Sequence, residues 1–148
     1  MARLKSMRWI FVAASILLLA GCASTGGGGG SSAPPPPSNE ELIQGIVEAA
    51  MDALAAKDID ALVSAYSDDF SSDNGDKADT IAFLQGAADQ GFLDGLEIDQ
   101  SGVVISVDGD NATAGPVALE GAFGAINLSF ELEKRDGKWW VTSQLQEQ

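Results

Sequence analysis

Residues 126–142 read INLSFELEKRDGKWWVT. Over the first seven positions apolar and polar side chains alternate, which is the two-residue period of a strand with one buried face. Arg135-Asp136-Gly137-Lys138 is turn chemistry, and it predicts a hairpin that continues through Thr142. The apolar side chains that we expect to point inward are Ile126, Leu128, Phe130 and Leu132.

Two adjacent tryptophans begin the second strand of this hairpin. Trp139 and Trp140 point to opposite faces, because side chains alternate along a strand. Trp139 shares its face with Val141, so we expect Trp139 in the core. Trp140 is then expected nearer to solvent, a partner or a pocket rim, and packing accounts for either ring better than a ligand role does.

A second pair of strands is predicted upstream. Apolar residues alternate with others from Val103 to Val107, and the turn residues of 108–111 follow. The next strand runs to about Glu120. Within it Gly115-Pro116 predicts a bulge or a sheet edge, since proline donates no ladder hydrogen bond.

Helices are predicted ahead of the strands. Ser38 and Glu41 have the spacing of a capping box, and an apolar stripe at helical spacing runs from Leu42 to Leu54. Asp58 caps a second, short helix whose stripe extends to Tyr66.

A third helix follows a polar stretch. Residues 67–77 are rich in Asp and Ser, Asp76 is placed to cap the helix, and Gly91 to stop it. Helices first and strands afterwards predict an α+β fold, with three N-terminal helices packed on a curved antiparallel sheet.

Three segments together are similar to the nuclear-transport-factor-2-like superfamily, which includes ketosteroid isomerases, polyketide cyclases and small binding proteins. They are AAKDIDAL at 55–62, YSDDF at 66–70 and EKRDGKW at 133–139. The resemblance covers residues 38–148. It implies a cone-shaped domain with a pocket between sheet and helices, but a fold does not define a function.

The isomerases of this superfamily use an aspartate base and an acidic or phenolic oxyanion donor in an apolar pocket. Tyr66 is expected in the core with its hydroxyl at a wet edge, and Asp68 and Asp69 are expected in a solvated turn. No aspartate falls within an apolar alternating strand, so we assign no catalytic residue. The side chains that we expect to line the pocket are Tyr66, Phe70, Phe83, Ile126, Leu128 and Phe130.

The acidic stretch also offers oxygen ligands of the kind that calcium prefers. Its spacing fails the EF-hand template, because Gly75 at loop position 6 would place Phe70 at position 1 and Ile81 at position 12. We therefore expect a solvated acidic loop and no metal or cofactor. The ligands considered are Asp68, Asp69, Asp73, Asn74 and Asp76.

The N-terminus has the pattern of a secretion signal. Residues 1–8 are basic, and the apolar run 9–20 is shorter than the 20 or so residues of a spanning helix. The run ends in Leu19-Ala20-Gly21-Cys22, which resembles the lipobox of bacterial lipoproteins. This resemblance implies removal of residues 1–21 and acylation of Cys22, which anchors the chain to a membrane. The alternative is an incidental cysteine in an uncleaved anchor helix.

Residues 22–37 join the lipidated cysteine to the domain. Five glycines and four prolines cannot form a packed core, so the segment is predicted to be a spacer, rather than a proline-rich ligand. A chain beginning at Ser38 is expected to fold. In Gram-negative lipoproteins an Asp after the cysteine often retains the protein in the inner membrane. Ala23 at that position favours the periplasmic face of the outer membrane.

The charge balance excludes several functions. The chain has 148 residues and a net charge of −14, and after loss of residues 1–21 the 5 remaining basic and 22 acidic residues carry −17. Such a surface repels nucleic acid and anionic lipid. The chain has no histidine and one cysteine, which excludes histidine-based catalysis, histidine metal sites and disulfides.

Two functions and one mode of assembly are compatible with these features. The first is a non-enzymatic envelope lipoprotein whose domain binds a small apolar ligand or a protein partner. The alternative is an isomerase, cyclase or dehydratase that works through a buried carboxylate, which would have a raised pKa. A homodimer packed sheet on sheet is compatible with both.

The lipobox generates the first prediction. Replacing Cys22 with serine removes the thiol on which the thioether-linked lipid forms. We expect Cys22→Ser to leave the precursor uncleaved and unlabelled by a fatty-acid probe in cells, whereas the wild-type chain is labelled. Normal acyl labelling of the serine variant would contradict the assignment.

Overall fold

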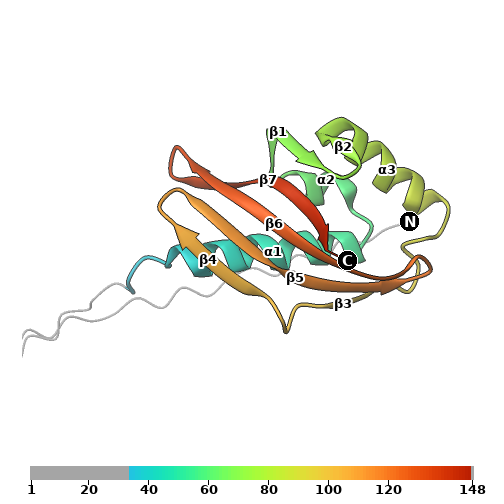
Figure 1. Ribbon diagram of the computed structural model, residues 1–148, viewed down its shortest axis with the longest axis horizontal. Helices are drawn as coiled ribbons and strands as arrows, with labels where there is room; N and C mark the ends of the chain where they lie inside the picture. The colour runs from blue at the N-terminus through green and yellow to red at the C-terminus, as the bar shows by residue number, and fades with distance from the viewer. Residues whose placement is uncertain (1–33, 148) are drawn as a thin grey trace, which may run out of the picture. The chain divides into compact units, whose positions relative to one another are not determined.

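The structure, a computed structural model, describes residues 34–147 (Figure 1). The predicted signal segment 1–21, Cys22 and most of the linker lie outside the described residues. Within the described part, no helix is both long and apolar enough to cross a membrane.

Between residues 34 and 147, three helices form as the sequence predicts: α1 (Asn39–Ala55), α2 (Ile59–Val63) and α3 (Lys77–Asp89). The capping box of α1 is confirmed. The Ser38 hydroxyl accepts from the backbone N–H of Glu41 at 3.2 Å, and the Glu41 carboxylate accepts from the N–H of Ser38 at 2.7 Å. Asp58 and Asp76 cap α2 and α3 through their carboxylates.

Within the described residues, seven strands form one curved sheet that does not close, and the helices pack against it (Figure 1). The order is β2-β1-β7-β6-β5-β3, and β4 also pairs with β5. This confirms the predicted α+β class. The strands are β1 (Tyr66–Ser72), β2 (Gly75–Asp76), β3 (Glu97–Asp99), β4 (Val104–Asp108), β5 (Asn111–Gly121), β6 (Gly124–Arg135) and β7 (Lys138–Glu147).

The prediction for Tyr66 and the polar stretch after it was wrong in secondary structure. Helix α2 ends at Val63, and Tyr66 is the first residue of β1, which pairs parallel to β7. The sheet is therefore mixed rather than antiparallel. Serine and aspartate have low strand propensity, so the sequence pattern does not predict β1. Its pairing with β7 is a tertiary effect that overrides propensity.

Strand β6 confirms the predicted alternation. Leu128, Phe130 and Leu132 are buried, while the intervening polar side chains are exposed or half-buried. Trp139 is also buried, and its indole N–H donates to the side-chain oxygen of Asn39 at 3.3 Å. Trp140 lies half-buried on the other face, as the alternation predicts.

The predicted bulge at Gly115-Pro116 is confirmed. The register of β5 against β6 shifts between Ala114 and Val117. Gly115 has φ +155°, and a Cβ atom there would lie 2.6 Å from the Ser129 hydroxyl oxygen and 2.9 Å from the Ser129 Cα. Only glycine allows the two strands to approach this closely.

The opposite faces of β6 generate the second prediction. Phe130→Ala should lower the free energy of unfolding by about 3–5 kcal/mol, because it leaves a cavity in the core. Ser129→Ala, on the exposed face, loses only an exposed hydrogen bond to Glu147 and should cost less than about 0.5 kcal/mol. Chemical denaturation of both variants measures the difference. Equal losses would mean that the faces are exchanged.

Candidate functional site

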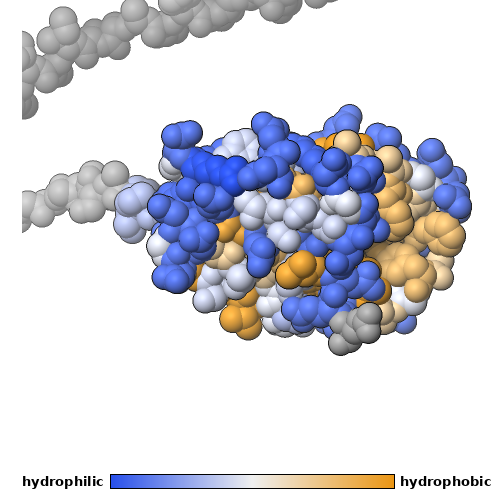
Figure 2. All heavy atoms as spheres, turned by 45° about the horizontal axis from the view of Figure 1, so that its top comes forward, coloured by the Kyte–Doolittle hydropathy of each residue, from blue (hydrophilic) through white to orange (hydrophobic). Residues whose placement is uncertain are grey.

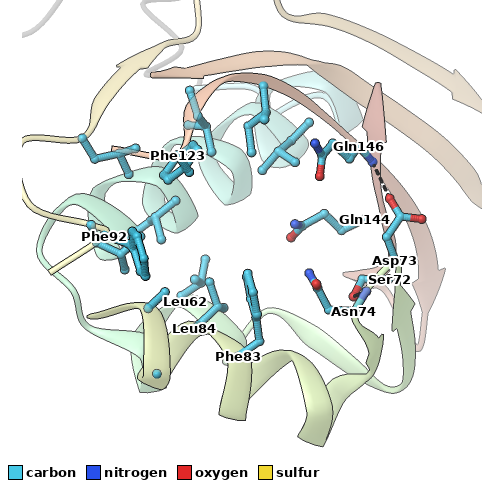
Figure 3. Close-up of a pocket in the computed structure, with 18 of the residues that line it drawn as sticks. Leu62, Ser72, Asp73, Asn74, Phe83, Leu84, Phe92, Phe123, Gln144 and Gln146 are labelled. Atoms are coloured by element: carbon cyan, nitrogen blue, oxygen red, sulfur yellow. Dashed lines mark hydrogen bonds between the residues drawn. The ribbon is translucent and has the colours of Figure 1, made fainter. Parts of the chain in front are cut away.

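A cavity of about 650 Å³ lies between the helices and the inner face of the sheet (Figure 3). Helix α3 and residues 90–96 form one wall, and strands β5, β6 and β7 form the other. Most of the lining is apolar. Its apolar side chains are Met51, Leu54, Leu62, Ala82, Phe83, Leu84, Ala87, Phe92, Leu93, Leu96, Leu119, Phe123, Ile126 and Leu128.

The sheet side of this wall continues the inward row of β6. Phe130 is in the packed core, and two residues earlier Leu128 is buried but lies on the cavity wall. Ile126, two residues earlier again, is half-buried beside its β5 partner Leu119. One alternating pattern therefore supplies both the core and the site.

Three phenylalanines on the cavity wall are unusually exposed. Phe83 of α3 is 54% exposed, Phe92 after α3 is 43% exposed, and Phe123 in the β5–β6 turn is 41% exposed. Figure 2 shows an apolar area at the right-hand end of the domain, where these elements lie in Figure 1. Exposed apolar groups around an opening are typical of an interaction site.

The opposite end of the cavity is polar (Figure 3). The end of β1 supplies Ser72, the β1–β2 turn supplies Asp73 and Asn74, and β7 supplies Gln144 and Gln146. The Asp73 carboxylate accepts from the backbone N–H of Gln146 at 3.0 Å, which ties the turn to β7. The Ser72 hydroxyl accepts from the N–H of Asn74 at 3.1 Å. Hydrogen bonds therefore hold the turn in place.

Tyr66 joins this polar end to the core. Its ring stacks on Phe70 with 4.1 Å between ring centroids, and both rings are buried. Its hydroxyl donates to the side-chain oxygen of Gln144 at 3.0 Å. Burial raises the pKa of the Tyr66 hydroxyl well above its usual range. Since the amide oxygen of Gln144 is engaged, the amide N–H groups are what Gln144 offers to the cavity.

The structure separates the six side chains that the sequence placed in the pocket. Tyr66, Phe83, Ile126 and Leu128 lie on the cavity wall. Phe70 and Phe130 are 1% and 2% exposed, belong to the core and do not line the cavity.

Sequence reasoning missed the polar end of the cavity. Gln144 and Gln146 are two residues apart in β7, and this spacing places them on one face of the strand. Exposed glutamines are ordinary, however, so the pattern alone carried no signal. Asp73 and Asn74 were considered only as metal ligands, because nothing in the sequence shows that their turn contacts β7.

The acidic residues next to the site have structural partners. Both oxygens of Asp69 accept from the Arg135 guanidinium, at 2.8 and 2.9 Å, and these hydrogen bonds hold the pKa of the Asp69 carboxyl well below its usual range. Asp76 caps α3. In the part of the chain that the structure describes, no group of three or more acidic, histidine or cysteine side chains is arranged to hold a metal ion.

Comparison with known proteins identifies the fold. No protein-family model and no curated protein matches the chain. A solved nuclear-transport-factor-2-like protein of unknown function from Pseudomonas putida has a TM-score of 0.60 and 18% identity, and the match covers 71% of this chain and 82% of that one.

Two further solved structures agree. One from Shewanella oneidensis, also nuclear-transport-factor-2-like and of unknown function, has a TM-score of 0.59 and 16% identity over 75% of this chain and 100% of that one. A protein of unknown function with a cystatin-like fold from Nostoc punctiforme has a TM-score of 0.61 and 16% identity over 74% and 92%. The described domain therefore has the nuclear-transport-factor-2-like, cystatin-like fold.

The environment of Tyr66 generates the third prediction. Tyr66 is the only tyrosine in the chain, so phenolate absorbance reports it alone. We expect no phenolate in the folded protein at about pH 11, whereas the urea-unfolded chain titrates near pH 10. The folded state keeps a proton that the unfolded state loses. Stability therefore falls as pH rises above the unfolded pKa, and Tyr66→Phe removes this part of the fall. A folded-state midpoint near pH 10 would contradict the burial.

Proposed function

We propose that this chain is a lipid-anchored binding protein of the bacterial cell envelope, whose domain holds a small, largely apolar ligand without catalysis. The observation that carries the proposal is the cavity of about 650 Å³ with an apolar wall and a polar end. Pockets for small molecules typically measure about 300–1,000 Å³ and combine apolar walls with a few polar groups.

The apolar end supports binding rather than simple packing. Phe83, Phe92 and Phe123 each leave two-fifths or more of their surface in contact with water. A ligand that covers these rings removes apolar surface from water, which contributes about 25 cal/mol per Å². The three rings come from different elements, so one ligand between them contacts α3 and the sheet together.

The polar end supports binding rather than proton transfer. The isomerases of this fold use a carboxyl group in an apolar pocket. Among the described lining residues Asp73 is the only carboxylate, and it is exposed and bonded to Gln146 N–H. The remaining polar groups are amides and hydroxyls, which hold a ligand by hydrogen bonds but exchange no proton near neutral pH. We therefore do not propose the enzymatic alternative.

The membrane part of the proposal rests on the sequence. Leu19-Ala20-Gly21-Cys22 follows a short apolar run, and the glycine- and proline-rich residues 23–37 separate Cys22 from the domain. A lipidated Cys22 keeps the domain near the membrane, at a distance set by this spacer. In a bacterium with two membranes, Ala23 favours the periplasmic face of the outer membrane.

The fourth prediction tests binding in the cavity. The neutral fluorophore N-phenyl-1-naphthylamine should bind saturably to a chain that begins at Ser38, with a rise in fluorescence. Gly86 lies on the cavity wall, and an added Cβ would have Gln90 Nε2, at 3.8 Å, as its nearest neighbour. Gly86→Trp places an indole in the cavity, and we expect it to weaken fluorophore binding at least tenfold.

Gly45→Trp is the matched control. Gly45 lies in the exposed face of α1, and an added Cβ there would have no neighbour within 4 Å. Both variants replace a helical glycine with tryptophan, so differences in helix propensity cancel. Gly45→Trp should bind like the wild type. Absence of saturable binding by the wild type, or equal weakening by both variants, would contradict the proposed function.

A further inference from the structure

We infer that the cavity selects uncharged amphiphiles with an alcohol-type head group and rejects carboxylates of the same length. This inference rests on the proposed binding function and specifies its ligand class. It follows from the hydrogen-bonding groups and the charge at the polar end, together with the apolar opposite end (Figure 3).

The polar end offers both donors and acceptors. The Gln144 amide oxygen accepts from Tyr66, which leaves the two amide N–H groups of Gln144 as donors. Asn74 supplies a side-chain amide with one acceptor and two donor positions. Asp73 uses one carboxylate oxygen for Gln146 N–H, and its other oxygen is a further acceptor. A hydroxyl, which donates and accepts at once, satisfies both kinds of group.

Charge distinguishes a hydroxyl from a carboxylate here. Asp73 is the only charged side chain among the described lining residues, so no lysine or arginine lines the cavity to neutralise an anion. Lys77 is not among the lining residues, and its ammonium donates to the Tyr66 carbonyl at 2.8 Å and lies 3.8 Å from an Asp68 carboxylate oxygen. An anionic head group would lose its hydration beside the negative charge of Asp73. No cation of the described lining would compensate for that loss.

The end of the cavity opposite the polar groups indicates the chemistry of the rest of the ligand. Phe92 and Phe123 lie at the end opposite Gln144 and Asp73 (Figure 3). The lining there is mostly apolar, and the amide of Gln90 donates to the Gly86 carbonyl at 3.0 Å, so the ligand's body at that end is apolar. A molecule with one hydroxyl and one hydrocarbon part therefore matches both ends.

The fifth prediction compares two head groups on the full chain in phosphatidylcholine vesicles. The probes are dodecan-1-ol and dodecanoate, each with the same mid-chain diazirine and terminal alkyne, at about pH 9, where the carboxylate is ionised. After photolysis, mass spectrometry quantifies labelled peptides from the cavity wall. We expect the wild type to carry mainly the alcohol label. Asp73→Asn should lower the alcohol-to-carboxylate ratio about fivefold, since it removes the like charge.

Asp73→Asn keeps a side-chain oxygen that can accept from Gln146, so the turn is preserved, and thermal unfolding verifies this. Comparing variants in the same vesicles with the same probes cancels differences in membrane partition. Asp108→Asn, at the end of β4 and outside the cavity lining, removes one exposed charge elsewhere and controls for the net negative charge. It should leave the label ratio unchanged.

The outcomes separate the two proposals. An unchanged ratio in Asp73→Asn, or an equal change in Asp108→Asn, overturns the head-group inference while cavity labelling still supports the binding function. Absence of label from the cavity-wall peptides with both probes, in every variant, overturns the binding function itself. A ratio that falls only in Asp73→Asn supports the inference.

Discussion

The inward apolar face of β6 is the constraint on which the rest of the structure depends. Strand β6 pairs with β5 on one side and β7 on the other, so both edges of its backbone form hydrogen bonds within the sheet. Its inward apolar side chains must then be shielded from water by packing against other residues. At Phe130 and Leu132 that cover is complete. At Ile126 the same face meets α3 and residues 90–96 across a cavity of about 650 Å³. The site is thus the uncovered end of the core.

The two ends of the cavity are stabilised by different interactions. Hydrogen bonds fix the polar end, where Tyr66 donates to Gln144 and Asp73 accepts from Gln146 N–H. These bonds connect β1, β7 and the β1–β2 turn, so the polar groups are held in place, which would lower the entropic cost of binding the proposed ligand. The apolar end is formed by exposed rings such as Phe92. Covering these rings with another apolar group would lower the free energy, because it removes apolar surface from water.

The net charge of the chain and the charge at the site are both negative, and both repel anions. The chain carries 22 acidic and 8 basic residues, and among the described lining residues the one charge is that of Asp73. The long-range field repels anions, but salt screens it within about 10 Å, whereas Asp73 acts at contact distance. An uncharged ligand escapes both effects. With the proposed anchor at Cys22, this charge would favour uncharged amphiphiles over anionic ones at the membrane surface.

Local patterns determined much of this protein. The alternation in β6, the hairpin turn at Asp136-Gly137, the caps of the three helices and the α+β class all follow from neighbouring residues, because strand period, turn geometry and capping are short-range effects. The sequence also placed Ile126 and Leu128 correctly on an inward face. Only the tertiary structure decided that Tyr66 begins a strand, that Phe70 and Phe130 lie in the core rather than on the cavity wall, and that the β1–β2 turn contacts β7 through Asp73 and Gln146. The position of Tyr66 and the contact of the turn with β7 depend on the parallel pairing of β1 with β7, which joins residues more than 70 positions apart, and β1 itself has no periodic signal.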